Sequence, residues 1–298
     1  MQHASPYKLQ TTNYKLLAVV GETASGKSAL AMELAQRFNG EIICADAMTV
    51  YQGFDIGSAK PSHTDQAAVP HHGLDVADAA EGFTAAQFKA LAEQAIPDIL
   101  VRGKLPIMVG GSGLYVDSVL FDYRFNALPN FGERDVLNTM SLAELLALAR
   151  ERGLDISGVD TANPRRVIRL IETNGARPKR SGLRSNTCVI GLKLERDQLA
   201  TRVQKRVATM LKQGLENEAK LLSQRYGWDC EAMKAIGYRE WQSYFAGTAS
   251  LQETTAQIVT ATMQLAKKQR TWFRRNNSIQ WVSDPKEAVD IVTTFLNK

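Results

Sequence analysis

Eight residues near the start of the printed sequence, 21–28, could bind a diphosphate or a triphosphate. Their sequence, Gly-Glu-Thr-Ala-Ser-Gly-Lys-Ser, fits the phosphate-binding P-loop pattern Gly-x-x-x-x-Gly-Lys-Ser/Thr. In such a loop the backbone N–H groups surround an anion, the lysine bonds terminal phosphate oxygens, and the last hydroxyl ligates Mg²⁺. The candidate diphosphate-binding residues are Gly21, Glu22, Thr23, Ala24, Ser25, Gly26, Lys27 and Ser28, and Ser28 is the candidate metal ligand. The pattern does not say which phosphate compound binds.

The segments on either side of the glycine-rich loop predict the elements that a P-loop needs. Residues 16–20 are an apolar run that predicts a buried strand. Residues 29–38 carry apolar side chains at helical spacing, and Gly40 follows as a stop signal. Because strand, loop and helix occur in this order, we favour a P-loop over a chance glycine-rich turn.

Strand and helix patterns continue to alternate through the first half of the chain. Residues 41–45 predict a second strand ending at Asp46, and residues 105–109 predict a third, with a helical pattern at 83–99 between them. This alternation predicts an α/β fold of the P-loop NTPase type, in which helices flank a parallel sheet. Ligands bind at the carboxyl ends of such strands, so the P-loop, Asp46 and the turn 110–113 should converge on one cleft.

The pattern after residue 125 changes, and it predicts the domain organisation. Residues 126–163 contain a polar connector and a helix that Ser141 would cap, which together indicate a small helical insertion. Asn163 and Pro164 then begin a new helix, and long helical patterns follow at 196–225 and 253–274. We therefore expect a catalytic core of residues 14–125 plus 164–298 that carries basic C-terminal helices.

Composition is typical of a soluble globular protein with a large core: 298 residues, 44% hydrophobic and 22% charged. No apolar run is long enough to span a membrane, and residues 1–13 lack the apolar stretch of a signal peptide, so we expect a cytoplasmic protein. The three cysteines, Cys44, Cys188 and Cys230, are widely spaced, which favours reduced thiols over disulfides or a zinc site. No heptad or interface stripe is present, and we expect a monomer.

Charge is distributed unequally along the chain. Residues 1–120 contain 8 Lys and Arg against 12 Asp and Glu, whereas residues 121–298 contain 28 against 19. A basic second half joined to a phosphate-binding first half suggests a small anionic substrate and a polyanionic partner. Basic residues between 267 and 275 adjoin Trp272 and Phe273, which suits phosphate contact and base stacking, although a solvated helix end has the same composition.

One expected acid is missing. The third strand ends in Val109-Gly110-Gly111, whereas a motor-type ATPase usually ends a strand in Asp or Asp-Glu to hold Mg²⁺ and orient water. Asp46 ends a different strand. Beside a diphosphate it could help to hold a hydrated metal or act as a base toward an acceptor, and a turn or helix-capping aspartate is the alternative.

Six blocks of sequence together resemble the bacterial tRNA dimethylallyltransferases, also called tRNA isopentenyltransferases. They are residues 21–28, 46–51 with 53–61, 109–115, 163–169, 236–239 and 264–273. They follow the order of that family over nearly the whole chain. The P-loop alone is shared by many functions, but Asp-Ile-Gly-x-Ala-Lys-Pro together with Gly-Gly-x-Gly-Leu-Tyr is specific.

The resemblance implies transfer of a dimethylallyl group from dimethylallyl diphosphate to the exocyclic amine of the adenosine 3′ of the anticodon in tRNA. It also implies residue roles. The P-loop and Mg²⁺ would hold the departing diphosphate, Asp46 would act as base, and Thr23 would contact the diphosphate or the amine. The implied catalytic residues are Asp46, Thr23, Lys27 and Arg239. The implied tRNA-binding residues are Asp46, Ala47, Met48, Thr49, Ser112, Arg134, Arg165, Arg166, Arg169, Arg239, Lys267, Lys268, Arg270 and Arg274.

The chain departs from the family pattern at several positions. Glu22 replaces the usual Pro of the P-loop and would face a diphosphate unless it points to solvent. Ala47 and Thr49 replace a Ser and a Gln, which removes polar contacts to tRNA, whereas Ser112 keeps the hydroxyl of the usual Thr. The insertion is shorter than usual, and we interpret the pair His71-His72 as structural.

Three other functions fit part of the sequence. A small-molecule kinase would explain the P-loop and the missing acid, but it leaves residues 46–61 and the basic C-terminal helix unexplained. Prenyl transfer to free adenosine phosphates would not need the basic second half. A tRNA-binding module without catalysis would not need Lys27, Ser28 and Asp46 together.

Overall fold

The computed structural model describes residues 14–125 and 131–298, which form two compact units. The first unit lies within residues 14–120 and 183–298, and the second comprises residues 121–182. The second unit is therefore larger than the insertion 126–163 expected from the sequence, and the bounds of the core change accordingly. Among the described residues, no helix has the length and apolar character needed to cross a membrane.

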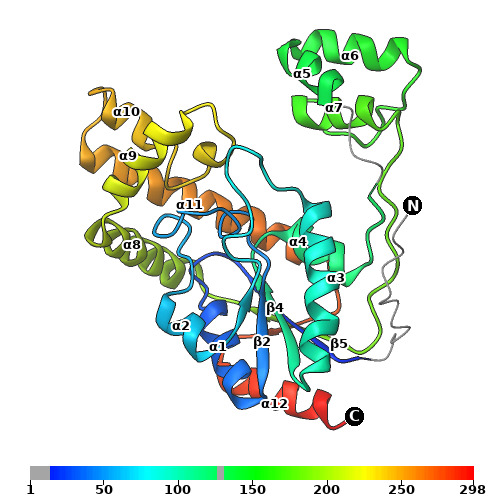
Figure 1. Cartoon of the computed structure of the whole chain (residues 1–298), viewed down its shortest axis with the longest axis vertical. Helices are drawn as coiled ribbons and strands as arrows, with labels where there is room; N and C mark the ends of the chain where they lie inside the picture. Colours follow the sequence, from blue (N-terminus) through cyan, green and yellow to red (C-terminus); the bar gives the residue numbers. More distant parts are fainter. Residues whose placement is uncertain (1–13, 126–130) are drawn as a thin grey trace, which may run out of the picture. The chain divides into compact units, whose positions relative to one another are not determined.

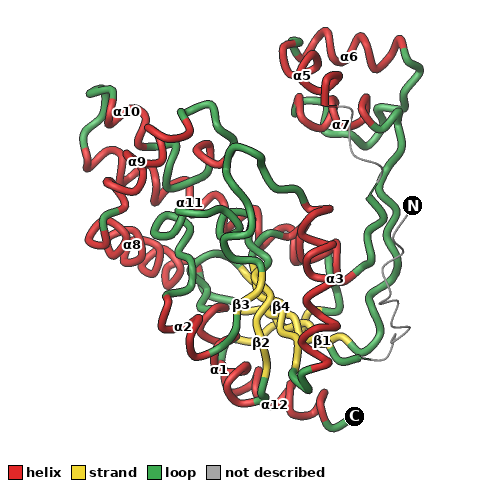
Figure 2. The backbone as a smooth tube through the Cα atoms, viewed as in Figure 1, coloured by secondary structure: helices red, strands yellow, loops and turns green. Residues whose placement is uncertain are grey.

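A parallel sheet forms the centre of the first unit (Figure 2). Its strands in the described residues are β1 Leu16–Gly21, β2 Gly40–Cys44, β3 His71–His72, β4 Leu105–Gly110, β5 Thr187–Leu192 and β6 Ile279–Val282. They are ordered β3-β2-β4-β1-β5-β6, and each neighbouring pair is parallel. Every residue of β1, β2 and β4 is buried, as expected for strands covered on both faces. The predicted α/β fold of the P-loop type is confirmed.

Helices cover both faces of this sheet (Figure 1). The helices of the first unit are α1 Lys27–Arg37, α2 His63–Ala68, α3 Ala85–Val101, α4 Gly113–Leu120, α8 Arg196–Gln213, α9 Leu215–Tyr226, the 3₁₀ turn η1 Ala232–Lys234, α10 Trp241–Phe245, α11 Leu251–Phe273 and α12 Pro285–Leu296. Helices α1 and α12 share one apolar cluster with alternate residues of the strands, including Leu17 and Val19. Helices α3, α4 and α11 also contact the sheet.

The long helix expected at 196–225 is two helices. Gly214 ends α8 and precedes α9 with φ of 101°, a left-handed conformation that favours glycine. The chain therefore changes direction at Gly214. Helix α11, by contrast, runs without interruption over the predicted segment and begins with a capping box between Ser250 and Glu253.

In the part of the second unit that the structure describes, the helices α5 Phe131–Thr139, α6 Leu142–Glu151 and α7 Pro164–Glu172 form a cluster. The predicted starts are confirmed, because Ser141 caps α6 and Asn163 caps α7 with Pro164 at its first position. Helix α7 belongs here rather than to the core because Val167, Ile168 and Ile171 pack against residues of α5 and α6. This apolar face accounts for the larger size of the unit.

Candidate active site

The carboxyl ends of β1, β2 and β4 surround a cavity of about 870 Å³ in the first unit. It is lined by the P-loop, by residues 46–49 after β2, by residues 110–115 after β4, and by segments 57–61 and 234–237. Helices α8 and α11 complete the lining. Gly110 permits the close approach of two of these strands, because a Cβ there would lie 2.0 Å from the Ala45 carbonyl oxygen. The predicted convergence of the three loops is confirmed.

The P-loop connects β1 to α1 through a tight turn. The Ser25 N–H donates to the Glu22 carbonyl over 3.2 Å, and the Lys27 ammonium donates to the same carbonyl over 3.3 Å. Gly26 has φ of 99° at the start of α1, a conformation that is costly for other residues. The first turn of α1 therefore presents its N–H groups and its partial positive charge to the cavity.

Burial lowers the pKa of Lys27 to about 8, and the positive charge of Arg206 contributes in the same direction. The negative charges of Asp46 and Glu22 oppose this shift. A lysine in this situation is stabilised in its charged form when an anion binds beside it. The surroundings of Lys27 are therefore suited to a bound phosphate group.

Arg206 is a cavity residue that the sequence analysis missed. It lies on α8, its Nη2 atom is 3.5 Å from the Ser58 carbonyl oxygen, and burial lowers its pKa while Asp46 opposes that shift. One turn earlier, Arg202 donates to the Ser25 carbonyl over 2.9 Å. The signal was the spacing of these two arginines by four residues, which places them on one face of a helix. Arg206 adds a second cation near Lys27.

Asp46 is fixed by its own loop. Its Oδ1 atom accepts a hydrogen bond from the Met48 N–H over 2.8 Å. The Ala47 N–H donates to the Ser112 hydroxyl over 2.9 Å, and the Ser112 N–H donates to the Ala45 carbonyl over 3.2 Å. The loops after β2 and β4 are thus joined, and the Asp46 carboxylate lines the same cavity as Lys27 and Arg206.

Glu22 neither faces a diphosphate nor points to solvent. It is 3% exposed, and its carboxylate accepts from Arg270 of α11 over 2.7 and 3.1 Å. Arg270 has a raised pKa, chiefly because of this contact. We therefore reassign Arg270 from tRNA contact to support of the P-loop, and only the backbone of Glu22 stays a candidate for diphosphate binding.

Gln269, next to Arg270, connects the P-loop to the loop after β4. Its side-chain oxygen accepts from the Thr23 N–H over 2.7 Å, and its side-chain nitrogen donates to the Gly111 carbonyl over 3.0 Å. A Cβ at Gly111 would lie 2.4 Å from that nitrogen, so a side chain there would displace the end of Gln269. The sequence analysis did not single out Gln269, because its partners lie 246 and 158 residues away.

The structure brings together some of the predicted tRNA-binding residues and separates others. Ala47, Met48, Thr49, Ser112 and Lys268 line the cavity with Asp46. Lys267 and Arg274 are exposed on α11 and at its end, outside the cavity lining.

Arg239 also lies outside the cavity lining. Its guanidinium contacts Glu240 over 2.9 Å and borders a separate hollow of about 420 Å³ beside α11. The catalytic role implied for Arg239 therefore stays a prediction from the sequence.

Arg134, Arg165, Arg166 and Arg169 belong to the second unit. The Arg134 Nη1 atom lies 2.8 Å from both carboxylate oxygens of Glu172, and Arg169 lies 3.5 Å from the same group. The Arg166 guanidinium lies 3.9 Å from the Asp160 carboxylate, which is a long contact. Arg134 and Arg169 therefore have structural partners within their own unit.

The donor groups in the cavity fit a divalent cation that arrives with a phosphate ligand. Across residues 14–125 and 131–298, no group of three or more His, Cys, Asp or Glu side chains could hold a metal by itself. The Ser28 hydroxyl and the Asp46 carboxylate line one cavity. Mg²⁺ is typically coordinated by one or two protein oxygens together with substrate phosphates and water, and this donor set fits that coordination.

Known proteins of similar sequence show the family to which this chain belongs. A family model described as IPP transferase matches residues 49–276. A tRNA dimethylallyltransferase of Anoxybacillus flavithermus is 40% identical over 278 residues, covering 90% of this chain and 89% of that protein. One from Streptococcus equi subsp. zooepidemicus is 41% identical over 298 residues, covering 96% and 99%.

Solved structures extend the comparison to the fold. A tRNA isopentenylpyrophosphate transferase from Bacillus halodurans has a TM-score of 0.74 and 36% identity, covering 95% of this chain and 97% of that one. A eukaryotic dimethylallyltransferase acting on tRNA has a TM-score of 0.76 and 26% identity, covering 90% and 73%. Because the family model spans most of the chain and relatives with 40% identity or more cover nearly all of it, this chain belongs to the IPP transferase family.

Proposed function

We propose that this protein transfers a dimethylallyl group from dimethylallyl diphosphate to the exocyclic amine of the adenosine 3′ of the anticodon in tRNA. The observation that carries the proposal is the convergence of Lys27, Arg206 and Asp46 on one cavity at the carboxyl ends of the strands. Two cations suit a diphosphate that leaves, and one carboxylate suits an amine that loses a proton. The names of the relatives supply the substrate class.

The cationic end of the cavity would stabilise the departing diphosphate. As the carbon–oxygen bond of the donor breaks, negative charge grows on the diphosphate oxygens, close to Lys27 and Arg206. Positively charged groups fixed before the reaction stabilise such charge without reorganising. Mg²⁺, when bound with the diphosphate at Ser28, would neutralise part of the same charge. No phosphoryl group is transferred, so no acid is needed to orient an attacking water.

Asp46 would receive the proton of the attacking amine. The amine nitrogen forms a bond to the first carbon of the dimethylallyl group, and its proton passes to the carboxylate. An aryl amine is a poor nucleophile, so orientation contributes more than basicity. The hydrogen bond from the Met48 N–H to Oδ1 holds the carboxylate in one orientation, which supports this role.

Apolar side chains of α8 and α11 would enclose the dimethylallyl group. Val207, Met210, Ile258 and Leu265 line the cavity across from its polar loops. An apolar surface there would exclude water, which otherwise competes with the amine for the reactive carbon. The size of the cavity, about 870 Å³, leaves room for an adenine beside the donor.

The tRNA would be held by basic residues around this cavity. Lys268 lines it, and Lys267 and Arg274 are exposed on the same helix or at its end. An adenosine within an anticodon loop must leave its stack to enter a pocket, so phosphate contacts are needed to hold its neighbours. The charge asymmetry of the chain supports a polyanionic partner over a free mononucleotide. Monomeric state and cytoplasmic location stay predictions from the sequence.

The P-loop geometry weighs against the kinase alternative. A kinase uses the backbone N–H groups of the loop to surround a nucleoside triphosphate, but the Thr23 N–H donates to Gln269. This contact favours a shorter phosphate ligand than a triphosphate.

The test is mass spectrometry of nucleosides from unmodified tRNA incubated with the protein, Mg²⁺ and dimethylallyl diphosphate. We expect a prenylated adenosine with the unaltered chain and a loss of about 10²- to 10⁴-fold in its rate of formation with Asp46→Ala. Parallel tubes contain AMP, or ATP with a small acceptor. Product on AMP, or ATP turnover, without product on tRNA would contradict the proposal.

A further inference from the structure

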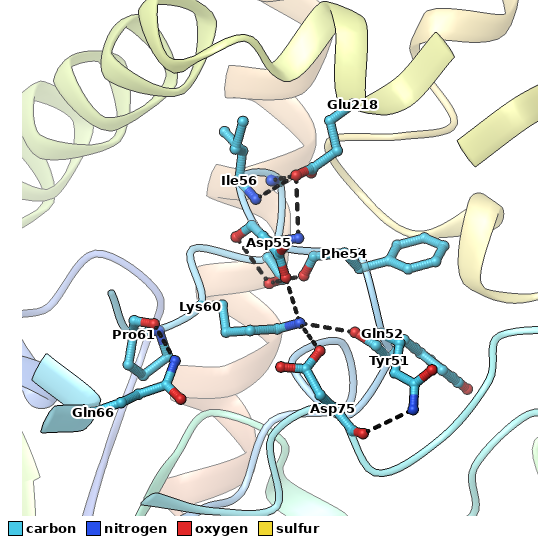
Figure 3. Close-up of polar contacts among 12 residues, drawn as sticks. Tyr51, Gln52, Phe54, Asp55, Ile56, Lys60, Pro61, Gln66, Asp75 and Glu218 are labelled. Atoms are coloured by element: carbon cyan, nitrogen blue, oxygen red, sulfur yellow. Dashed lines mark hydrogen bonds and ion pairs between the residues drawn. The ribbon is translucent and has the colours of Figure 1, made fainter. Parts of the chain in front are cut away.

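Residues 55–61 form a loop between Phe54 and α2 that lines the cavity but carries none of the groups assigned to chemistry. Gly57, Ser58, Ala59, Lys60 and Pro61 all border the cavity. The loop is folded on itself, with the Lys60 N–H donating to the Asp55 carbonyl over 3.0 Å and the Ala59 N–H to the Ile56 carbonyl over 2.9 Å. A loop without regular structure that borders a reaction site must be held by other contacts. Figure 3 shows that two charged side chains provide them.

Lys60 holds the loop from within. Its ammonium lies 2.6 Å from Asp55 and 2.5 Å from Asp75, and it donates to the Tyr51 carbonyl over 2.9 Å (Figure 3). Its side chain is 4% exposed. The three partners account for the three N–H bonds of an ammonium. Lys60 is therefore occupied by the loop and is not a free cation for a phosphate.

Glu218 holds the same loop from α9. Its Oε2 atom accepts from the Asp55 N–H over 3.2 Å and from the Ile56 N–H over 2.8 Å (Figure 3). Its Oε1 atom accepts from the Gly57 N–H over 2.9 Å and from the Tyr238 hydroxyl over 2.8 Å. One carboxylate thus accepts hydrogen bonds from three consecutive backbone N–H groups. Hydrogen bonds to a charged acceptor are stronger than those between neutral groups.

The loop fixed in this way contacts the buried cation of the cavity. Gly57 packs against Tyr238 so closely that a Cβ would lie 2.5 Å from the ring, and the next residue, Ser58, turns its carbonyl toward Arg206. The distance from Ser58 O to Arg206 Nη2 is 3.5 Å. A chain of contacts therefore leads from Glu218 through residues 55–58 to Arg206.

We propose that Glu218 is a positioning residue for the donor diphosphate: it fixes the backbone of residues 55–57, so that the Ser58 carbonyl holds the Arg206 guanidinium in the cavity. The inference rests on the proposed function, in which Arg206 stabilises the departing diphosphate. Glu218 itself lies outside the cavity lining and touches no substrate. Its loss should therefore change how the donor is used and leave the binding of tRNA as it was.

The experiment is a double-mutant cycle on prenyl transfer with Glu218→Ala and Arg206→Ala. Glu218→Ala should lower kcat/KM for dimethylallyl diphosphate by about 10- to 100-fold, since small misplacements of catalytic groups have effects of that size. The KM for tRNA should stay within about twofold. In the Arg206→Ala background, Glu218→Ala should change kcat/KM by less than about twofold, because two residues that act through one contact are not additive.

Two further variants separate positioning from folding. Glu218→Gln keeps one acceptor oxygen for the loop and should give an intermediate loss in kcat/KM even if Glu218→Ala does not fold. Glu216→Gln is the matched control, because this neighbour on α9 accepts a hydrogen bond from the Tyr244 hydroxyl, over 3.2 Å, rather than from the loop, and it should retain full activity.

Each outcome decides the proposal. An equal effect of Glu218→Ala in both backgrounds, or a loss confined to the KM for tRNA, would overturn it. If the unaltered chain makes no prenylated tRNA, the proposed function fails, and calorimetry with inorganic diphosphate then tests the inference by itself. Weaker binding by Glu218→Gln than by Glu216→Gln supports it, and equal binding contradicts it.

Discussion

Each of the two units contains a buried glutamate that holds arginine, but the glutamates do different things. In the first unit, Glu22 of the P-loop is 3% exposed and pairs with Arg270 of α11. In the second, the Glu172 side chain is 1% exposed and pairs with Arg134 and Arg169 among three small helices. A buried carboxylate without a partner is costly, so these contacts constrain the segments that carry the glutamates and arginines.

The difference lies in the charges that remain outside these pairs. In the first unit, Lys27, Arg206 and Asp46 line a cavity, and burial lowers the pKa of Lys27 and of Arg206. In the second unit, the arginines lie on helices with an apolar interior. Charges gathered in a cavity bind a specific anion, whereas exposed arginines contribute to a polyanion in small, salt-dependent steps. The number of arginines in a segment therefore says little about which of them bind a substrate.

Removal of Arg206 should have the largest effect among the charged residues compared. We expect Arg206→Ala to lower kcat/KM for the donor by about 10²- to 10³-fold, the usual effect of deleting one group that stabilises transition-state charge. Lys205→Ala, an exposed neighbour on α8, is the matched control and should have little effect. Steady-state rates with saturating tRNA measure both. Equal losses for the two variants would mean that Arg206 acts as ordinary surface charge.

Burial lowers the pKa of Lys27 to about 8, and donor binding should therefore depend on pH. As the pH rises through 8, the free protein loses the ammonium that attracts a diphosphate. Affinity for inorganic diphosphate should therefore fall about tenfold between pH 7 and pH 9. Calorimetry at both values measures it, and Lys27→Met reports the titration of the diphosphate itself. If the affinity falls equally in the unaltered protein and in Lys27→Met, the pH dependence does not come from Lys27.

Breaking the Glu22–Arg270 pair should lower the free energy of unfolding more than it lowers the rate of prenyl transfer. Arg270→Ala leaves the Glu22 carboxylate buried without its partner, and should lower the free energy of unfolding by roughly 1–3 kcal/mol. Glu22→Pro with Arg270→Leu removes both charges and should restore most of that loss. Urea denaturation of the three proteins tests this. If the double variant has as low a free energy of unfolding as Arg270→Ala, the stabilisation does not come from neutralising the buried Glu22 charge alone.

The sequence predicts the parts of the site that are local in the chain. The P-loop, the strand ending at Asp46 and the turn with Ser112 are each encoded within a few residues, and they converge because parallel strands share one edge. The same reasoning failed for Gln269 and the Glu22–Arg270 pair, whose partners lie up to 248 residues apart. Which face of α11 meets the P-loop depends on packing that no local pattern contains.

The fold shows the same limit. No strand was expected after residue 110, yet β5 and β6 complete the sheet. Strand β5 pairs with β1 and β6 pairs with β5, and both follow the second unit in the chain, so their place in the sheet is set by the fold rather than by their periodicity. The start of α7 was predicted from Asn163 and Pro164, but its membership of the second unit depends on which apolar residues Val167 and Ile171 pack against.

The smallest expected effects are in the second unit, where the arginines should divide into two kinds. Arg134→Ala removes the closest partner of buried Glu172, and it should reduce amide-exchange protection across α5, α6 and α7. Arg166→Ala removes an exposed charge. It should leave protection unchanged, weaken tRNA binding about two- to threefold and lower the salt dependence of binding by about one counterion.

Exchange measured by mass spectrometry and tRNA titrations at several salt concentrations separate the two variants. Glu172→Gln added to Arg134→Ala should recover part of the lost protection, because a neutral amide is cheaper to bury than an unpaired carboxylate. If Arg134→Ala keeps full protection and changes the salt dependence as Arg166→Ala does, both arginines contact the polyanion. The buried glutamate would then organise a binding surface, and the two units would use their glutamates for the same purpose.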